Sequence, residues 1–226
     1  MFKVDLTESD IEALKEALKE MKNTITIKLF TSNDRIGCFA CGETEKLVRT
    51  IRDSSPLVGN EKAIELEIYE VSRDRDAFKM YEIDRVPTII LLDDAIAYIG
   101  MPAGEEIKGF IETIIRLSTN DHGLSPKTVE EIVQLRGRVS IEVVVTPLCP
   151  YCPYAVLLAN MFAYASKIYG NGNVKSVIIE AYENPDIADK YTISTVPTIV
   201  INGRVAFVGL PYEEQLLNAI KKLALQ

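Results

Sequence analysis

Apolar side chains follow strand-like patterns in four segments of this chain. Residues 25–29 alternate apolar and polar side chains, which predicts a strand with one covered face. Residues 141–145 are nearly continuous and β-branched, which predicts a strand covered on both faces. Two further apolar runs, at 64–68 and 174–179, predict a second strand in each half of the chain.

Helix-start signals precede amphipathic segments in both halves. Thr7 can cap a helix over about residues 8–21, and Ser125 with a proline directly after it can start one over about residues 126–135. Two more amphipathic helices are expected towards the ends of the halves, over about residues 104–117 and 212–225. A long helix after each first strand and a short one after each second strand complete the alternation.

The same order of elements occurs twice, at an offset of about 110 residues. Residues 68–83 align without a gap on residues 178–193, and both segments run into the sequence Val-Pro-Thr-Ile, at 86–89 and 196–199. Two strands of a hairpin close each half, and the Asn-Gly pair at 202–203 is a favourable two-residue turn. Parallel crossovers followed by a hairpin predict a mixed sheet with helices on both faces, so each half is expected to be an α/β unit.

The repeat predicts two domains, at residues 1–119 and 120–226. The junction between them is the polar run 118–123, which is rich in turn-forming residues. This run is too short for a flexible tether, so we expect the two units to pack as one rigid body.

Composition excludes several classes of partner. The chain has 226 residues, of which 47% are hydrophobic and 26% charged, as is usual for a globular protein. A net charge of −8 argues against binding to nucleic acid or to an anionic membrane surface. The N-terminus lacks the apolar segment of a signal peptide and no stretch approaches a membrane span, so a cytoplasmic location is expected. The absence of Trp and the abundance of Ile, Glu and Lys fit a thermophilic source.

All four cysteines lie in two Cys-x-x-Cys motifs, Cys38 to Cys41 and Cys149 to Cys152. Each motif is expected at a helix start, where unpaired amides and the helix dipole stabilise a thiolate. The spacing puts the second sulfur one helical turn on, so it can attack a mixed disulfide formed at the first. Cys38 and Cys149 are therefore predicted to attack, and Cys41 and Cys152 to resolve.

The two motifs differ in their surroundings. Pro147, Pro150 and Pro153 bracket the second motif, where they fix φ and remove amide donors. The first motif lacks these prolines, and its approach loop, within residues 31–37, is expected to hold about five extra residues. The two sites should therefore differ in reduction potential, and we expect Cys149 to dominate catalysis.

Other uses of the cysteine pairs stay open at this stage. A zinc site would require two pairs that 107 residues separate to meet in space. The single histidine, His122, lies in the presumed junction and is expected to be an exposed loop residue, so no metal site is predicted. Structural disulfides are disfavoured because so small a loop restrains the unfolded chain little. A non-catalytic peptide-binding or chaperone module would need an exposed apolar groove.

Each half resembles a thioredoxin or glutaredoxin domain in its order of strand, Cys-x-x-Cys, strand, short helix and Val-Pro-Thr. Cys149-Pro150-Tyr151-Cys152 is the motif seen in glutaredoxins, and residues 183–185 (Glu-Asn-Pro) are similar to a thioredoxin segment. The whole chain resembles the two-domain, glutaredoxin-like protein disulfide oxidoreductases of hyperthermophilic archaea and some thermophilic bacteria, particularly over residues 84–88 and 146–153.

This resemblance implies dithiol–disulfide exchange on protein thiols and disulfides, covering reduction, oxidation and possible isomerisation, with no cofactor beyond the redox-active disulfides. Electrons would come from a thioredoxin-reductase-type flavoprotein, and the C-terminal motif would be the more active. It further implies that Pro87 and Pro197 are cis and face the cysteines. The backbones of Val86 and Val196 would then pair with an extended substrate peptide.

Glu70 and Glu180 occupy equivalent positions at the ends of the second strands. They are either solvated strand-end carboxylates or buried groups that relay a proton to or from the resolving cysteine, in which case burial would raise their pKa. The acidic residue that thioredoxins bury six positions before the first cysteine has no counterpart here, since Ser32 and Val143 stand there. Glu70 and Glu180 are therefore the candidates to replace it.

Overall fold

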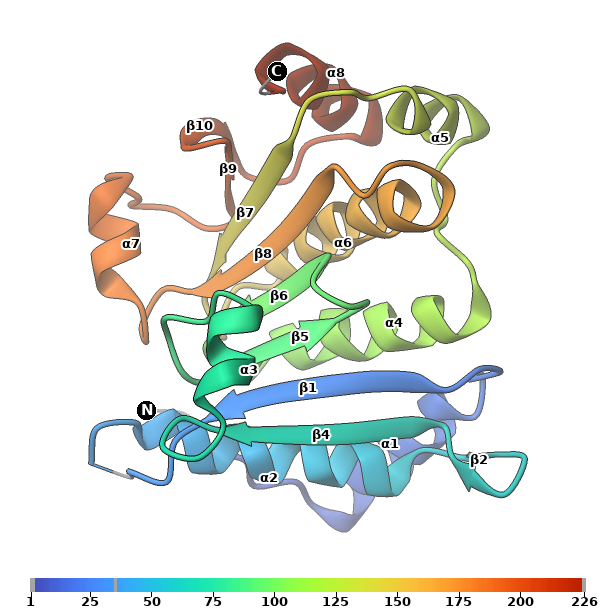
Figure 1. The fold of residues 1–226 in the computed structure, drawn as a ribbon, viewed down its shortest axis with the longest axis vertical. Helices are drawn as coiled ribbons and strands as arrows, with labels where there is room; N and C mark the ends of the chain where they lie inside the picture. The colour runs from blue at the N-terminus through green and yellow to red at the C-terminus, as the bar shows by residue number, and fades with distance from the viewer. Residues whose placement is uncertain (1–2, 35, 225–226) are drawn as a thin grey trace.

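The computed structural model describes residues 3–34 and 36–224, and apart from one short hairpin in the first half it contains the same order of helices and strands twice (Figure 1). The elements of the first half are α1 (Glu8–Leu18), β1 (Ile25–Thr31), α2 (Phe39–Ser54), β2 (Leu57–Val58), β3 (Glu61–Lys62), β4 (Ile64–Glu70), α3 (Arg75–Met80), β5 (Thr88–Leu91), β6 (Ile96–Ile99) and α4 (Glu106–Thr119). Those of the second half are α5 (Pro126–Val133), β7 (Val139–Val145), α6 (Cys152–Tyr169), β8 (Val174–Glu180), α7 (Pro185–Lys190), β9 (Thr198–Ile201), β10 (Arg204–Val208) and α8 (Glu213–Leu223). No helix of these described residues is both long and apolar enough to cross a membrane.

The predicted helices and strands are confirmed, with shifted ends. The first helix, predicted over 8–21, ends at Leu18. The last, predicted over 212–225, ends at Leu223, and residue 225 lies outside the described residues. The short hairpin of β2 and β3 was not predicted, because two-residue strands leave no apolar pattern in the sequence.

Both predicted helix starts carry their caps. The Thr7 hydroxyl accepts a hydrogen bond from the Asp10 amide (3.2 Å), and Asp10 Oδ2 accepts one from the Thr7 amide (2.9 Å). The Ser125 hydroxyl likewise accepts from the Thr128 amide (3.3 Å) at the start of α5. These side chains satisfy amides that a helix start leaves without a partner.

Eight of the described strands form one mixed sheet, in the order β10-β9-β7-β8-β6-β5-β1-β4. In the first half β1 pairs in parallel with β4 and antiparallel with β5, and β7 pairs in the same way with β8 and β9. The halves meet where β6 and β8 pair in parallel, from Ile96 opposite Ser176 to Ile99 opposite Ile179. The two expected sheets are thus a single one, because each edge strand satisfies the other's backbone groups.

Helices cover the sheet and share a core across both halves. In Figure 1, α2, α4 and α6 lie behind the sheet and α3 lies in front of it. Helices α4 and α6, one from each half, pack against each other. The main apolar core is continuous from the first half, with Leu29 and Phe110, to the second, with Phe162. A smaller cluster around Phe30 lies on the α3 side.

A buried polar network also ties the halves together. Asn160 on α6 donates from Nδ2 to the Tyr98 hydroxyl on β6 (2.8 Å) and to Thr113 Oγ1 on α4 (3.0 Å). Its Oδ1 accepts from the Ser176 hydroxyl on β8 (2.7 Å). Because a buried polar group without a partner is costly, this network favours one relative arrangement of the four elements.

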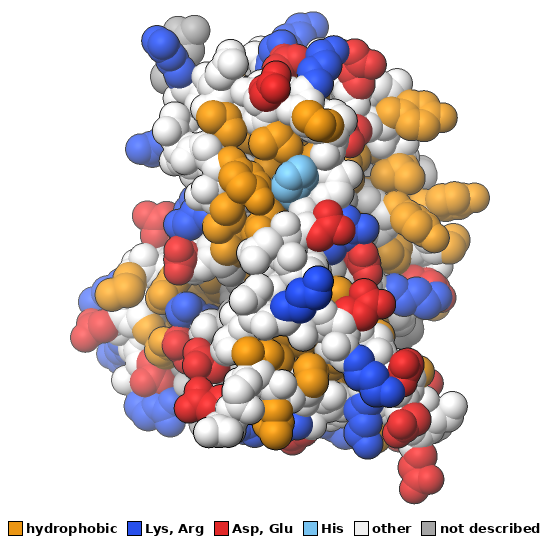
Figure 2. Space-filling model, turned by 90° about the vertical axis from the view of Figure 1, so that its right-hand side faces the viewer, with side chains coloured by type: hydrophobic (Ala, Val, Ile, Leu, Met, Phe, Trp, Pro, Cys, Tyr) orange, Lys and Arg blue, Asp and Glu red, His pale blue; other side chains and the backbone are white. Residues whose placement is uncertain are grey.

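The junction between the halves is more ordered than a linker. Ser118 belongs to α4, is buried, and accepts hydrogen bonds from the amides of Lys22 (2.9 Å) and Asn23 (3.0 Å). His122, expected to be exposed, is half-buried: its ring meets Tyr169 edge-on, with apolar side chains beside it in Figure 2. The division at residues 119 and 120 stays a prediction.

Candidate active site

Both Cys-x-x-Cys motifs form disulfides. Cys38 is bonded to Cys41 and Cys149 to Cys152, with Cα atoms 5.4 Å apart in each pair. The first cysteine of each pair is 7% exposed, whereas the second is fully buried. Only the first cysteine of each pair thus keeps any exposed surface, in the order that the predicted roles assume.

At the first motif, Cys38 directly precedes α2 and occupies its N-cap position. Its approach loop is organised by Asp34, whose Oδ1 accepts from the amides of Ile36 and Gly37 (3.0 Å each) and whose carbonyl accepts from the Cys38 amide (2.8 Å). These backbone hydrogen bonds lower the pKa of Asp34. The Ser32 amide points to the buried Cys41 Sγ at 3.3 Å.

The approach loops differ by fewer residues than expected. Residues 32–37 separate β1 from Cys38, and residues 146–148 separate β7 from Cys149, so the first loop is three residues longer and not about five. Residue 35 of this loop lies outside the described residues. The error arose because β1 continues to Thr31, beyond its predicted end at residue 29.

At the second motif the helix begins later than predicted. Helix α6 starts at Cys152, so Cys149 lies one turn before it and not at its start. Pro153 takes an early helical position, and a proline is tolerated only in the first turn of a helix. The turn directs the Cys152 amide at Cys149 Sγ, 3.1 Å away. This amide is placed to stabilise a thiolate on Cys149.

Both Val-Pro peptide bonds, Val86–Pro87 and Val196–Pro197, are cis, as the resemblance implied. In the first half, the Val86 carbonyl oxygen lies 3.5 Å from Cys38 Sγ, so the proline loop faces the disulfide. Cys38, Val86 and Pro87 also line one cleft of about 620 Å³. The pairing of Val86 and Val196 with substrate stays a prediction.

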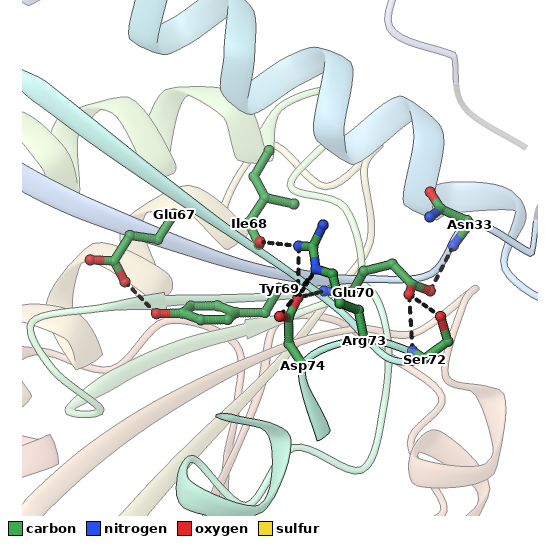
Figure 3. A network of polar contacts seen from close by, with 8 residues as sticks. All are labelled: Asn33, Glu67, Ile68, Tyr69, Glu70, Ser72, Arg73 and Asp74. Atoms are coloured by element: carbon green, nitrogen blue, oxygen red, sulfur yellow. Dashed lines mark hydrogen bonds and ion pairs between the residues drawn. The ribbon is translucent and has the colours of Figure 1, made fainter. Parts of the chain in front are cut away.

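Glu70 is a buried hydrogen-bond acceptor and not a solvated strand end (Figure 3). Its carboxylate accepts from the Ser72 hydroxyl, from the Ser72 amide (3.0 Å) and from the Asn33 amide (3.3 Å). The hydrogen bond from Ser72 is the main cause that lowers the pKa of Glu70. A carboxylate held ionised in this way is a poor proton donor near neutral pH, which disfavours the relay hypothesis at this residue.

Glu180 has the opposite electrostatics at the equivalent position. It is 4% exposed, and burial raises its pKa although its oxygens accept from the amides of Tyr182 (3.1 Å) and Glu183 (2.7 Å). Glu180 lines the same cleft as Cys38. The structure thus brings Glu180 to the disulfide of the other half, which the repeat did not indicate.

Glu106 is the residue that sequence reasoning missed most clearly. Its side chain is 1% exposed, and neither carboxylate oxygen has a hydrogen-bond partner among the described residues. Burial is the main cause that raises the pKa of Glu106 to about 8, with a contribution from Glu180. The available signal was its helical spacing with the buried Phe110 and Ile114, which puts a carboxyl in an apolar stripe.

The start of α4 packs on the prolines that bracket the second motif. The Glu105 amide donates to the Pro147 carbonyl (2.9 Å), and a Cβ on Gly109 would lie 3.1 Å from Pro153 Cα. A narrow void lined by Glu106, Glu180 and Val145 lies between the halves. The helix that carries the buried Glu106 carboxyl therefore packs on two prolines that bracket the second Cys-x-x-Cys.

Two further features of the site were not predicted. Glu183 accepts a hydrogen bond from the Met101 amide (3.2 Å), and burial raises the pKa of Glu183 to about 7. Arg85 binds Asp186 of the second half with two hydrogen bonds (2.9 and 2.6 Å). Residues 3–34 and 36–224 contain no group of three or more His, Cys, Asp or Glu side chains placed to hold a metal ion.

Comparisons with known proteins agree with this geometry. Residues 139–221 match the thioredoxin domain family. The thioredoxin of the archaeon Methanocaldococcus jannaschii is 42% identical over 86 residues, which are 38% of this chain and 96% of that protein. An alkyl hydroperoxide reductase component of Pseudomonas putida is 27% identical over 57% of this chain and 24% of its own length.

Solved structures extend the similarity to the whole chain. A domain of the alkyl hydroperoxide reductase AhpF of Enterococcus faecalis has the same fold, with a TM-score of 0.79 at 20% identity over 96% of this chain and 99% of that one. A protein disulfide oxidoreductase of Aeropyrum pernix superposes with a TM-score of 0.95 at 44% identity, over 99% of this chain and 95% of that one. This chain therefore belongs to the thioredoxin-fold protein disulfide oxidoreductases, enzymes of dithiol–disulfide exchange.

Proposed function

We propose that each disulfide is an active site in which the first cysteine attacks and the second resolves. The observation that carries this proposal is the exposure of Cys38 and Cys149 beside the fully buried Cys41 and Cys152. In the reducing direction, the thiolate of the first cysteine attacks a substrate disulfide, forms a mixed disulfide and expels one substrate thiolate. The second cysteine then attacks the first, releases the other substrate thiolate and re-forms the enzyme disulfide, so two electrons pass to the substrate.

The C-terminal site is the dominant one in this proposal. The hydrogen bond from the Cys152 amide to Cys149 Sγ supports it, because a donor to the sulfur stabilises the thiolate over the thiol. Three large side chains around this motif are strongly exposed: Leu148 (69%), Tyr151 (66%) and Tyr154 (62%). An apolar rim of this kind suits segments of unfolded or partly folded protein substrates.

The backbones before the two prolines are the proposed contacts for a substrate strand. The 3.5 Å approach of the Val86 carbonyl to Cys38 Sγ supports this role in the first half. A peptide extended along Val86 or Val196 would use main-chain hydrogen bonds, which accept many sequences. Pro87 and Pro197 would contact the mixed disulfide that forms between enzyme and substrate.

Glu106 takes the place of Glu70 and Glu180 as the proposed proton relay of the second site. Its burial, its unpaired oxygens, its pKa near 8 and the contact of its helix with Pro147 support this role. A carboxyl with a pKa near the working pH can accept the proton of the Cys152 thiol as that thiol attacks the mixed disulfide. Glu180 lies in the same void and keeps the Glu106 pKa high by charge repulsion.

The partners in this proposal are protein thiols and disulfides and a flavoprotein reductase of the thioredoxin-reductase type. The similarity to part of an alkyl hydroperoxide reductase supports a reductase partner. The net charge of −8 supports a role without nucleic acid or anionic membranes. The proposed location is the cytoplasm, as expected from the sequence. The two disulfides themselves would carry the electrons, with no further cofactor. Each disulfide would belong to one of two units, at residues 1–119 and 120–226.

Insulin reduction by single-site variants tests the proposal. Cys149→Ser should lose most of the wild-type rate, whereas the matched variant Cys38→Ser should keep most of it. A larger loss in Cys38→Ser would reverse the assignment of the dominant site. A wild-type protein that binds reduced insulin chains without any dithiol turnover would instead be a peptide-binding module.

A further inference from the structure

The cleft at Cys38 has walls from both halves of the molecule. Cys38, Val86 and Pro87 form the wall of the first half, and Glu180, Tyr182 and Glu183 contribute to the wall of the second. Its volume is about 620 Å³, enough for one or two side chains of a peptide. The reactive sulfur of the first site is therefore approached through a space that the first half alone does not enclose.

A salt bridge holds the two walls in position. Arg85, which directly precedes Val86, pairs with Asp186 at Nη1–Oδ1 and Nη2–Oδ2 distances of 2.9 and 2.6 Å. Asp186 lies in α7, three residues after Glu183. Because the bidentate pair constrains both distance and orientation, the loop before Pro87 and the segment with Glu183 keep a fixed relation.

The second wall is acidic. Glu180 and Glu183 both line the cleft, and the described residues around it include no Lys, Arg or His. Glu183 accepts one hydrogen bond, from the backbone amide of Met101, and has no cationic partner among the described residues. Burial accordingly raises the pKa of Glu183, which a cation in the cleft would reverse.

The repeat shows that the fold itself does not require an acid at this position. The residue equivalent to Glu183 in the first half is Arg73, which pairs with Asp74 (2.7 Å) and donates to the Ile68 carbonyl (3.2 Å), as Figure 3 shows. Glu183 therefore has opposite charge to its counterpart. Glu183 lines the cleft that also contains Cys38.

We infer that the second half completes the substrate site of the first, where Glu183 favours substrates that carry a lysine or arginine beside the reactive cysteine. The inference rests on the proposed attack by Cys38. When the Cys38 thiolate attacks a peptide disulfide, the neighbouring substrate side chain enters the cleft. A basic side chain gains an ion pair there, whereas an acidic one meets two carboxylates of like charge.

The test uses the reduced double variant Cys149→Ser/Cys152→Ser, in which only the first site reacts. Two disulfide-linked peptides of identical sequence, except for Lys or Glu beside the cysteine, serve as substrates. The first-turnover rate constant should be about fivefold higher for the Lys peptide, the effect of one partly buried ion pair. Glu183→Gln should bring the ratio close to one, and Glu183→Arg should invert it.

Controls separate a specific effect from a general change of charge. Glu130→Gln removes the same charge from α5 and should leave the ratio unchanged. In the reciprocal background Cys38→Ser/Cys41→Ser, Glu183→Gln should not alter the ratio. Equal rates for both peptides, or a ratio that Glu183→Arg does not move, would overturn the inference and leave the exchange activity of Cys38 standing. Failure of both peptides to react would overturn the proposed function of Cys38 as well.

Discussion

At the first motif the helix begins directly after Cys38, whereas at the second it begins only at Cys152. The first sulfur lies in a cleft with two carboxylates of the other half. The second has an amide aimed at it, and its bracketing prolines contact a helix that carries a buried, unpaired carboxyl. Each disulfide therefore lies in surroundings to which the other half contributes, so the two copies of the fold do not give their cysteine pairs equivalent environments.

Glu70 and Glu180 show the same contrast at equivalent positions of the repeat. Glu70 is surrounded by donors from its own half, which lower its pKa, whereas Glu180 is buried at the boundary between the halves, which raises its pKa. Equivalent position in the repeat is therefore a poor guide to the protonation state of these carboxyl groups. Their pKa depends on how many hydrogen-bond donors surround each carboxyl and on how deeply it is buried.

The largest expected effect is loss of turnover at the second site when Glu106 is replaced. In a Cys38→Ser/Cys41→Ser background, Glu106→Gln should slow peptide disulfide reduction about a hundredfold, as removal of a general acid–base group does. In the Cys149→Ser/Cys152→Ser background it should have an effect of less than about twofold. The matched control is Glu105→Gln, at the neighbouring residue, which is half-buried and pairs with Lys108. Equal losses in both backgrounds would show that Glu106 serves neither site specifically.

A smaller effect of the Glu106→Gln substitution is expected on the pH dependence of stability. The folded-state pKa of Glu106 is raised to about 8 from an ordinary value of 4.5. Between these two pH values the native protein keeps a proton on Glu106 that the unfolded chain has released. Stability should therefore fall as pH rises from about 4.5 to 8, and Glu106→Gln should remove about 3 kcal/mol of the fall between pH 5 and pH 8. Urea unfolding of oxidised protein at pH 5 and pH 8 measures the difference. Parallel pH profiles for variant and wild type would contradict the burial of an unpaired carboxyl.

The smallest expected effect is a difference in stability between variants of the two equivalent glutamates, Glu70 and Glu180. Glu70→Gln should lower the urea midpoint at pH 7, because an amide is a weaker acceptor than the carboxylate that its donors now stabilise. That loss should vanish as pH falls through the lowered pKa of Glu70, where wild type also loses the charge. Glu180→Gln should leave the midpoint unchanged or raise it, since burial disfavours its charge. Shifts of the same sign in both variants would contradict the contrast between the two sites.

Much of the fold was predictable from local patterns. The apolar runs at 25–29 and 141–145, the caps at Thr7 and Ser125 and the Asn-Gly turn at 202–203 all specify structure through neighbours in sequence. Asn202 and Gly203 do adopt positive φ (47° and 75°), as this turn requires. The cysteine pairs were also found from their spacing, whereas the cis state of Pro87 and Pro197 was expected from the family resemblance.

The remainder depended on contacts between distant segments. The pairing of β6 with β8 joins two edge strands, and no residue pattern distinguishes an edge that will pair from one that stays exposed. The contact of Pro153 with Gly109 of α4 likewise joins segments from the two halves that lie far apart in the sequence. Glu183 looks like an ordinary surface acid in the sequence and Glu106 stands in an apolar stripe, but only the structure shows that burial at the boundary, together with repulsion from Glu180, raises the pKa of both.

The sequence by itself determined that this protein has two thioredoxin-like units with one redox cysteine pair each, because that information lies in short-range patterns and in their repetition. Tertiary structure alone decided which carboxyl groups line the cleft at Cys38 and which is buried on the helix that packs beside the second motif. Protonation and charge complementarity depend on burial and on neighbours across the β6–β8 boundary, and both arise only when the two units fold against each other.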